Sequence, residues 1–250
     1  VSQFFGGDAG IESPVVAFVC SEQAADALES YGRRAGRGED AGYQPILPVR
    51  VNCTDTVGEA HVLHALAAGA DGVAIVGCGD ACLHSGPDPK AELVDRMNVA
   101  TNDLELGART SFFAPEGGDP AGFAAELDEF VEGLDASPLP TGEHEATGTG
   151  RPDSPREPFT THDWALESLR VILEETDPDR DVIRGLDTFG RMEVSDDCNL
   201  TPTCSTLCPT DAIQRSGDGE LQFNHADCVN CGLCESGCPE GAITMEPGLE

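Results

Sequence analysis

The sequence predicts an α/β fold for its first half, a parallel sheet with helices on both faces, followed by a small cysteine-rich domain. Two observations support this prediction. Up to about residue 134, short apolar runs alternate with amphipathic segments, which is the pattern of a parallel sheet covered by helices. From Cys198 onward the chain repeats itself, because the segment 204–213 returns, with its Cys-Pro pair, at 234–243.

The first half contains four strand-length apolar runs, each followed by a segment with the periodicity of an amphipathic helix. The expected strands lie at 15–19, 46–51, 72–77 and 111–113. The expected helices lie at about 24–31, 57–67, 93–104 and 120–131. Gly69 and Gly133 are typical residues at a helix end, and Asp119 before Pro120 is a typical helix start.

The composition changes after about residue 135. Residues 136–158 are mostly Pro, Gly, Ser, Thr and Glu without periodicity, which predicts a flexible linker after a first domain at 1–135. A connecting helix region is expected at 159–188, where Thr160 and Asp163 have the spacing of a capping box. The second domain is expected at 189–250.

The chain is strongly acidic, with 46 acidic and 14 basic residues and a formal net charge of −32. On either side of residue 140 there are 23 acidic and seven basic residues, so the acidity belongs to the whole surface. A nucleic-acid partner held by a basic face is therefore excluded. The same charge, with a single lysine, favours a halophilic protein in a saline cytoplasm, where salt screens the self-repulsion.

The remaining composition narrows the class of protein further. No apolar run approaches the length of a membrane-spanning helix, so we expect no membrane insertion. The chain begins with Val1, which indicates either a processed start or a piece of a longer polypeptide. Eleven cysteines, an odd number in a chain without a secretion signal, indicate metal or redox ligation rather than a full set of disulfides.

The second copy of the repeat has the complete spacing of a 4Fe-4S ligand run, Cys228-x2-Cys231-x2-Cys234-x3-Cys238, followed by proline. Thiolates three residues apart on a tight loop reach successive corners of one cluster, while the fourth, redirected by the proline, points to a second cluster. A zinc site with four cysteine ligands is the alternative, which the internal repeat and the two Cys-Pro pairs disfavour.

The first copy of the repeat lacks one thiolate, because Thr201 stands where the second cysteine belongs. Residues 189–247 resemble the bacterial-type two-cluster ferredoxins, which are small α+β domains. The resemblance implies that a complete 4Fe-4S cluster is held by Cys208, Cys228, Cys231 and Cys234. It implies that the other cluster is held by Cys198, Cys204 and Cys238. Since a hydroxyl is a poor iron ligand, we expect a 3Fe-4S cluster there, the alternative being 4Fe-4S closed by water, hydroxide or Thr201.

The four remaining cysteines follow the expected strands: Cys20, Cys53, Cys78 and Cys82. Because the carboxyl ends of parallel strands meet at one edge, where such folds bind their ligands, these four thiols are expected to converge. The alternative is that they are small buried hydrophobic side chains. Their places at or beyond the strand ends favour a metal site, with 2Fe-2S preferred to zinc.

The segments around these cysteines, 49–53, 64–73 and Gly77-Cys78-x3-Cys82-x-His84, resemble the delta, iron-sulfur subunit family of methyl-viologen-reducing hydrogenase over about residues 14–135. The resemblance implies a flavodoxin-like fold and a 2Fe-2S cluster. It also implies electron transfer between a hydrogenase or formate dehydrogenase and a heterodisulfide-reductase-type flavoprotein. That family usually has a second cysteine where Gln23 stands here. His84 is a candidate hydrogen-bond donor near the cluster, whereas His61 and His64 fit ordinary helix positions.

We therefore expect a non-catalytic electron-transfer component of an oxidoreductase complex, with three clusters and with catalysis in a partner. The alternative is an assembly or docking scaffold whose N-terminal domain holds zinc or no metal and whose tail is a ferredoxin. No glycine-rich dinucleotide motif or phosphate-binding loop is present. A nucleophilic enzyme built from Cys78, His84 and Asp80 is not selected by the spacing.

Overall fold

The computed structural model describes residues 14–38, 46–79, 82, 84, 90–115, 120–139, 160–217 and 219–250. The chain divides into two compact units, Val1–Pro178 and Asp179–Glu250. This boundary falls inside the expected connecting region at 159–188. The expected linker at 136–158 lies outside the described residues except for 136–139, and Asp119 and Asp80 lie outside them too.

The first unit contains a four-stranded parallel sheet in the order β2-β1-β3-β4. Its strands are β1 (Val15–Cys20), β2 (Ile46–Val51), β3 (Gly72–Val76) and β4 (Thr110–Phe113). This is the strand order of a doubly wound, flavodoxin-like sheet. The predicted α/β fold with a parallel sheet is confirmed, and no end of a predicted strand differs from the observed end by more than one residue.

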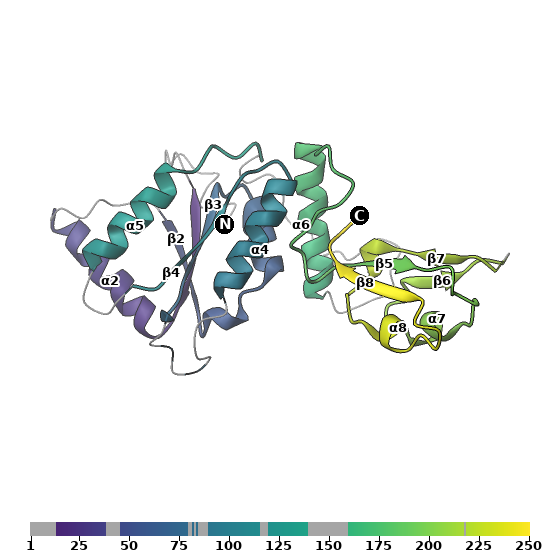
Figure 1. Cartoon of the computed structure of the whole chain (residues 1–250). Helices are drawn as coiled ribbons and strands as arrows, with labels where there is room; N and C mark the ends of the chain where they lie inside the picture. The colour runs from purple at the N-terminus through teal and green to yellow at the C-terminus, as the bar shows by residue number, and fades with distance from the viewer. Residues whose placement is uncertain are drawn as a thin grey trace. The chain divides into compact units, whose positions relative to one another are not determined.

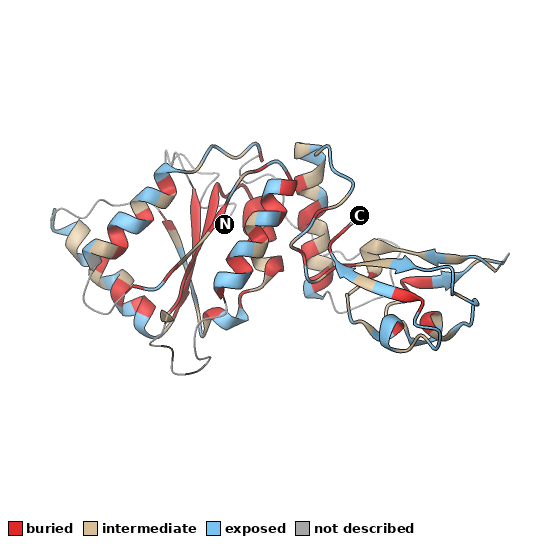
Figure 2. Ribbon diagram, viewed as in Figure 1, coloured by how far each residue is buried: buried red, intermediate tan, exposed pale blue. Residues whose placement is uncertain are grey.

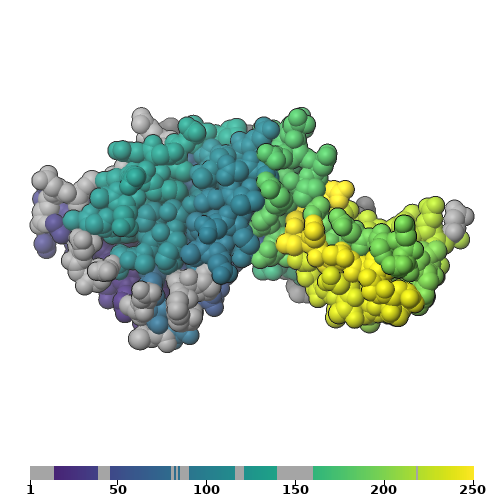
Figure 3. All heavy atoms as spheres, viewed as in Figure 1, coloured from purple at the N-terminus to yellow at the C-terminus, as the bar shows by residue number. Residues whose placement is uncertain are grey.

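Helices cover both faces of this sheet (Figure 1). They are α2 (Gln23–Gly36), α3 (Glu59–Ala67), α4 (Lys90–Asp103) and α5 (Pro120–Glu132). On the face covered by α2 and α5, Phe123 makes edge contacts with Tyr31 at 5.9 Å and with Phe113 at 6.0 Å between ring centroids. The central strands are buried along their length (Figure 2), while α4 and α5 form much of the first unit's visible surface in Figure 3. Burial on both faces explains the continuous apolar runs of β1 and β3.

The helix expected at 57–67 is shorter than predicted, because a separate turn precedes it. The short helix η1 (Thr54–Thr56) follows Cys53, whose carbonyl accepts bonds from the N–H and the hydroxyl of Thr56 at 3.1 and 2.7 Å. Gly58 is extended and precedes α3, which begins at Glu59. Cys53 therefore begins its own closed turn, a feature that apolar periodicity does not reveal.

Helix α6 (Thr161–Thr176) packs against α3 in the first unit. Its predicted capping box is confirmed: the Asp163 N–H donates to the Thr160 hydroxyl at 3.2 Å, and the Thr160 N–H donates to the Asp163 carboxylate at 2.9 Å. The Trp164 ring lies 5.3 Å from the ring of His61 and 4.7 Å from that of His64. Burial lowers the pKa of both imidazoles. The rings of these two histidines on α3 thus form the surface against which Trp164 of α6 packs.

The described part of the second unit contains two antiparallel strand pairs, two very short α-helices and the 3-10 turn η3 (His225–Asp227). Strand β5 (Gly190–Val194) pairs with β8 (Ile243–Pro247), and β6 (Ile213–Arg215) pairs with β7 (Leu221–Phe223). The short helices are α7 (Thr203–Leu207) and α8 (Leu233–Ser236). This agrees with the small α+β domain that the resemblance to the two-cluster ferredoxins implied.

The internal repeat is also visible in the backbone. Leu200 and Asn230 are related by the repeat, and both have positive φ, at 62° and 50°. Asp211 and Gly241 are related in the same way, at 56° and 61°. A left-handed leucine is unfavourable by itself, so the loop around it, rather than local preference, determines that conformation. The two copies therefore form the same loop even where the sequence differs.

No helix in the described parts of the chain has both the length and the apolar character needed to cross a membrane.

Candidate metal centres

Three strands of the first unit deliver cysteines to one rim of the sheet. Cys20 is the last residue of β1, Cys53 lies two residues after β2, and Cys78 lies two residues after β3. Because β2, β1 and β3 are neighbours and parallel, their carboxyl ends lie side by side. The Cys78 thiol donates to the Cys20 sulfur at 3.4 Å. The structure thus brings together thiols 58 residues apart in the sequence.

The Cys53 sulfur is fixed by the turn that it begins. Its Sγ accepts a bond from the Asp55 N–H at 3.5 Å, while its carbonyl accepts the Thr56 N–H. The backbone of this turn therefore fixes the position of the Cys53 sulfur at the rim.

Cys82 and His84 lie in the loop after β3, where only part of the chain is described. The Cys82 N–H donates to the Gly79 carbonyl at 3.0 Å, and the residue is partly buried. His84 is exposed. Burial raises the pKa of Cys78 to about 11, and its bond to Cys20 acts in the same direction. Without a metal, Cys78 is accordingly a neutral thiol at physiological pH.

In the second unit, the cysteines of the two repeat copies meet in one apolar cluster. Cys204 of α7 and Cys234 of α8 are buried together with Ile213 and Ile243. Partly buried neighbours complete this cluster: Met192, Cys208, Leu221, Phe223, Cys238 and Met245. Apolar side chains, mostly from the short strands, therefore surround the thiols, as a cluster site requires.

Cys208, Cys228, Cys231 and Cys234 are neighbours in space. The pKa of Cys228 is raised by burial and by the charges of Cys208 and Cys231, against N–H groups of Asn230 and Gly190 that lower it. Burial raises the pKa of Cys234 to about 11, with Cys228 and Cys231 adding to the shift. Mutual repulsion of thiolates is relieved when iron takes up their charge.

The two Cys-Pro cysteines behave differently from these. Burial raises the pKa of Cys208, but the hydroxyl and N–H of Thr210 and the N–H groups of Ile213 and Ala212 outweigh it, so the pKa is lowered. For Cys238 the Ala242 N–H, at 3.3 Å from Sγ, is the main cause of a lowered pKa. In both loops, which follow Pro209 and Pro239, the hydrogen bonds to sulfur thus stabilise the thiolate form relative to the thiol.

Thr201, at the position of the missing cysteine, is exposed and held by its neighbour. Its hydroxyl donates to the Asn199 carboxamide oxygen at 2.6 Å, and its N–H donates to the same oxygen at 2.9 Å. Asn199 was not among the predicted site residues. An Asn two residues before a Thr is a turn signal that could have identified it.

Gly190 is the second site residue that the sequence did not single out. A Cβ at this position would lie 3.1 Å from the Cys228 sulfur, 2.9 Å from the Asn230 side-chain oxygen and 2.8 Å from the Met245 methyl. Asn230 is itself anchored by a bond from its amide to the Asp187 carbonyl at 3.0 Å. Only glycine fits this close approach of β5 to the sulfur.

The chemistry of these donors, thiols with backbone N–H groups directed at sulfur, fits iron-sulfur clusters. Within the described residues, no three histidine, cysteine or acidic side chains converge on one point as the ligands of a single ion would. Backbone N–H groups aimed at sulfur and an apolar sheath are the features by which proteins stabilise such clusters.

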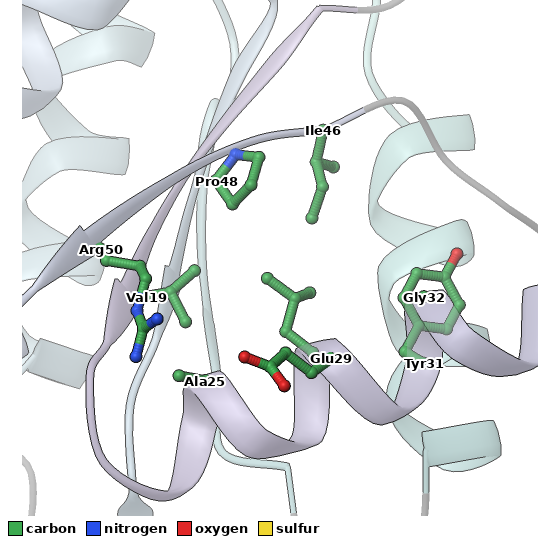
Figure 4. A pocket seen from close by; sticks show the side chains of 9 residues that line it. Val19, Ala25, Glu29, Tyr31, Gly32, Ile46, Pro48 and Arg50 are labelled. Atoms are coloured by element: carbon green, nitrogen blue, oxygen red, sulfur yellow. The ribbon is translucent and has the colours of Figure 1, made fainter.

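A pocket of about 340 Å³ lies beside the edge strand, between α2 and β2 (Figure 4). Apolar side chains line most of it, including Val19, Tyr31, Ile46 and Pro48, with Glu29 and Arg50 as charged members. None of the described cysteines lines this pocket. It is therefore separate from the thiol sites.

Two known families match the chain. The family of the methyl-viologen-reducing hydrogenase delta subunit matches residues 15–136, and the 4Fe-4S binding domain matches residues 221–244. The first match covers the whole parallel sheet, with Cys20, Cys53 and Cys78. The second covers the complete ligand run.

Individual relatives match shorter stretches. Formate hydrogenlyase subunit 2 of Escherichia coli is 50% identical over 79 residues, 32% of this chain and 32% of the relative. One uncharacterized ferredoxin of Methanocaldococcus jannaschii is 45% identical over 49 residues, 20% of this chain and 28% of the relative. Another from the same organism is 39% identical over 44 residues, 18% of this chain and 71% of the relative.

The chain thus spans about a third or less of the first two relatives and most of the third. Two of these relatives are ferredoxins by name, while the hydrogenase delta subunit family matches the part of the chain that contains the sheet. The chain combines a domain of the methyl-viologen-reducing hydrogenase delta subunit family with a C-terminal domain that belongs to the 4Fe-4S ferredoxins.

Proposed function

We propose that the chain is an electron-transfer component of an oxidoreductase complex. It relays electrons between a formate dehydrogenase or hydrogenase-like partner and a heterodisulfide-reductase-type flavoprotein or other acceptor. The observation that carries this proposal is the apolar cluster in which cysteines of both repeat copies meet, Cys204 and Cys208 with Cys234 and Cys238. The similarity to a formate hydrogenlyase subunit and a hydrogenase delta subunit supports the choice of partners.

One cluster is proposed for each of three sets of cysteines. A 2Fe-2S cluster is held at the sheet rim by Cys20, Cys53, Cys78 and Cys82. A 4Fe-4S cluster is held by Cys208, Cys228, Cys231 and Cys234. A third cluster is held by Cys198, Cys204 and Cys238 and is 3Fe-4S, because the Thr201 hydroxyl is engaged with Asn199.

When bound, the clusters supply one-electron carriers. The chain's own residues hold the thiolates, exclude water and place dipoles on sulfur. N–H groups directed at Cys208, Cys228 and Cys238 stabilise added negative charge, so they favour the reduced state. Each of these groups therefore raises the reduction potential of the site that it serves.

The second candidate is a docking scaffold with zinc, or no metal, at the sheet rim. The observation that favours a rim without metal is the close approach of Cys20 and Cys78, together with the raised pKa of the Cys78 thiol.

Metal analysis of the anaerobically prepared full chain distinguishes the two. The electron-transfer proposal expects about nine or ten iron atoms per chain and no zinc. The scaffold expects about seven or eight iron atoms, with zinc where the rim holds metal. Cys53→Ser and Cys231→Ser serve as mutual controls, because each removes iron from one unit and leaves the spectrum of the other unchanged. Iron that is insensitive to both substitutions overturns the proposed ligand sets.

We place this function in a salt-rich cytoplasm. Thiolates reserved for clusters suit a reducing compartment, and a net charge of −32 suits high ionic strength.

A further inference from the structure

The chain has 13 arginines and a single lysine, Lys90, and that lysine is buried. It is 9% exposed and stands at the first position of α4. A cation at a helix N-terminus opposes the helix dipole, so the helix itself gains nothing from it. An aliphatic or acidic residue would suit that position better, which indicates that Lys90 serves the segment it contacts.

The Lys90 ammonium binds the turn that begins at Cys53. Its Nζ donates to the Asp55 carbonyl at 3.2 Å and to the Val57 carbonyl at 3.0 Å, and it lies 3.6 Å from the Asp55 carboxylate. Asp55 lies inside η1 and Val57 is the residue that ends it, so the ammonium contacts both the turn and its exit. The three donors of a compact ammonium can satisfy several such acceptors at once.

The same turn determines where the Cys53 sulfur lies. Asp55 presents its N–H to the Cys53 sulfur and its carbonyl to Lys90. On the other side, the Gly58 N–H donates to the His61 ring nitrogen at 3.1 Å, which ties the end of the turn to α3. The segment from Cys53 to Gly58 is thus held from α4 and from α3.

Arginine would not reproduce this arrangement. Its guanidinium is planar and longer, with donors in a fixed fork that matches a carboxylate rather than two carbonyls of a tight turn. This is a physical reason for lysine, and not arginine, at position 90 of a chain whose other basic residues are all arginines.

We propose that Lys90 is a positioning residue for the cluster at the sheet rim: its buried ammonium holds the Cys53–Gly58 turn and so fixes the Cys53 sulfur at the rim that also carries Cys20 and Cys78, and its charge raises the reduction potential of that cluster. The role in positioning stands on the protein alone, while the effect on the potential rests on the proposed function. The charge favours the reduced state because reduction adds an electron near a fixed cation.

The experiment compares Lys90→Met and Lys90→Arg with Arg33→Met in the full chain. Arg33 is an exposed cation of the same unit, so its loss controls for net charge. In the metal-free protein, hydrogen exchange is measured at the Thr56 and Val57 amides, which bond inside the turn at 3.1 and 2.9 Å. In the cluster-loaded protein, iron content and the rim cluster's potential are measured by paramagnetic resonance, with the ferredoxin signals as internal reference.

We expect exchange at Thr56 and Val57 to be about tenfold faster or more in Lys90→Met. The sheet amide of Gly77, which bonds to the Phe113 carbonyl, should stay protected and so report an intact fold. The potential of the rim cluster should fall, or its iron should be lost, while Arg33→Met changes neither. Lys90→Arg should keep the potential closer to that of the unmodified protein but still lose protection in the turn.

Unchanged protection of the turn in Lys90→Met with a protected sheet overturns the proposal. If Lys90→Met does not fold, Lys90→Arg decides: full protection of Thr56 and Val57 overturns the positioning role, and lost protection supports it. If the unmodified protein binds no cluster at the rim, the proposed function fails there, while the exchange experiment still tests the turn.

Discussion

Replacing Gly190 by alanine tests whether the approach of β5 to Cys228 shapes the ferredoxin site. The added Cβ would meet the Met245 methyl at 2.8 Å, the Asn230 oxygen at 2.9 Å and the Cys228 sulfur at 3.1 Å. Met245 ends in a flexible methyl that can move. Asn230 is anchored to Asp187 and Cys228 is buried, so the strain falls on the ligand loop.

Overpacking of this kind costs about 1–3 kcal/mol. Converted at about 1.4 kcal/mol per factor of ten, the cluster-bound form should be disfavoured by roughly 5- to 150-fold. The Gly190 N–H, which lowers the pKa of Cys228, would be displaced as well. The substitution should therefore weaken the complete 4Fe-4S site more than it weakens the fold.

The assay follows loss of visible absorbance in the presence of an iron chelator, under anaerobic conditions and at high salt. Gly217→Ala is the matched control, because Gly217 has open space around its Cβ position and an ordinary φ. We expect faster loss of the cluster in Gly190→Ala alone. Equal rates in both variants would refute the reasoning.

Three further predictions concern other parts of the chain. Thr201→Cys supplies the absent thiolate and should add about one iron per chain while removing the 3Fe-4S resonance; persistence of that resonance would contradict the ligand assignment. Because burial lowers the pKa of His61 and His64 below the ordinary 6.5, their neutral forms stabilise the fold above that pH, and this stability is lost as pH falls below it. The fluorescence of Trp164, the single tryptophan, should therefore report weaker packing of α6 on acidification of the metal-free protein, and a signal constant between pH 7 and 5 would argue against it. Dialysis into low-salt buffer should promote unfolding and loss of visible absorbance, since about 1 M salt screens charges beyond roughly 3 Å; unchanged absorbance would contradict the halophilic interpretation.

Much of the fold could be predicted because each pattern has a local physical cause. The apolar runs of β1 and β3 are continuous because both faces are covered, and Thr160 with Asp163 caps α6 through bonds over three residues. The helix after Cys53 was predicted too early, since the closed turn at Thr54–Thr56 has no apolar periodicity. Burial of Arg109, which donates to the carbonyls of Leu106 and Asp71, is equally invisible in a pattern of hydrophobicity.

The sequence by itself determined the chemistry of this protein: the thiol spacing, the thirty-residue repeat with its Thr201, and the charge are properties of residue type and order. Tertiary structure alone decided which groups serve those thiols. It placed Gly190 against Cys228, aligned Cys20 with Cys78, and directed the single lysine onto the turn of Cys53. Spacing along the chain specifies ligands that share a loop, but contacts between distant segments arise only when burial of apolar surface brings strands and helices together.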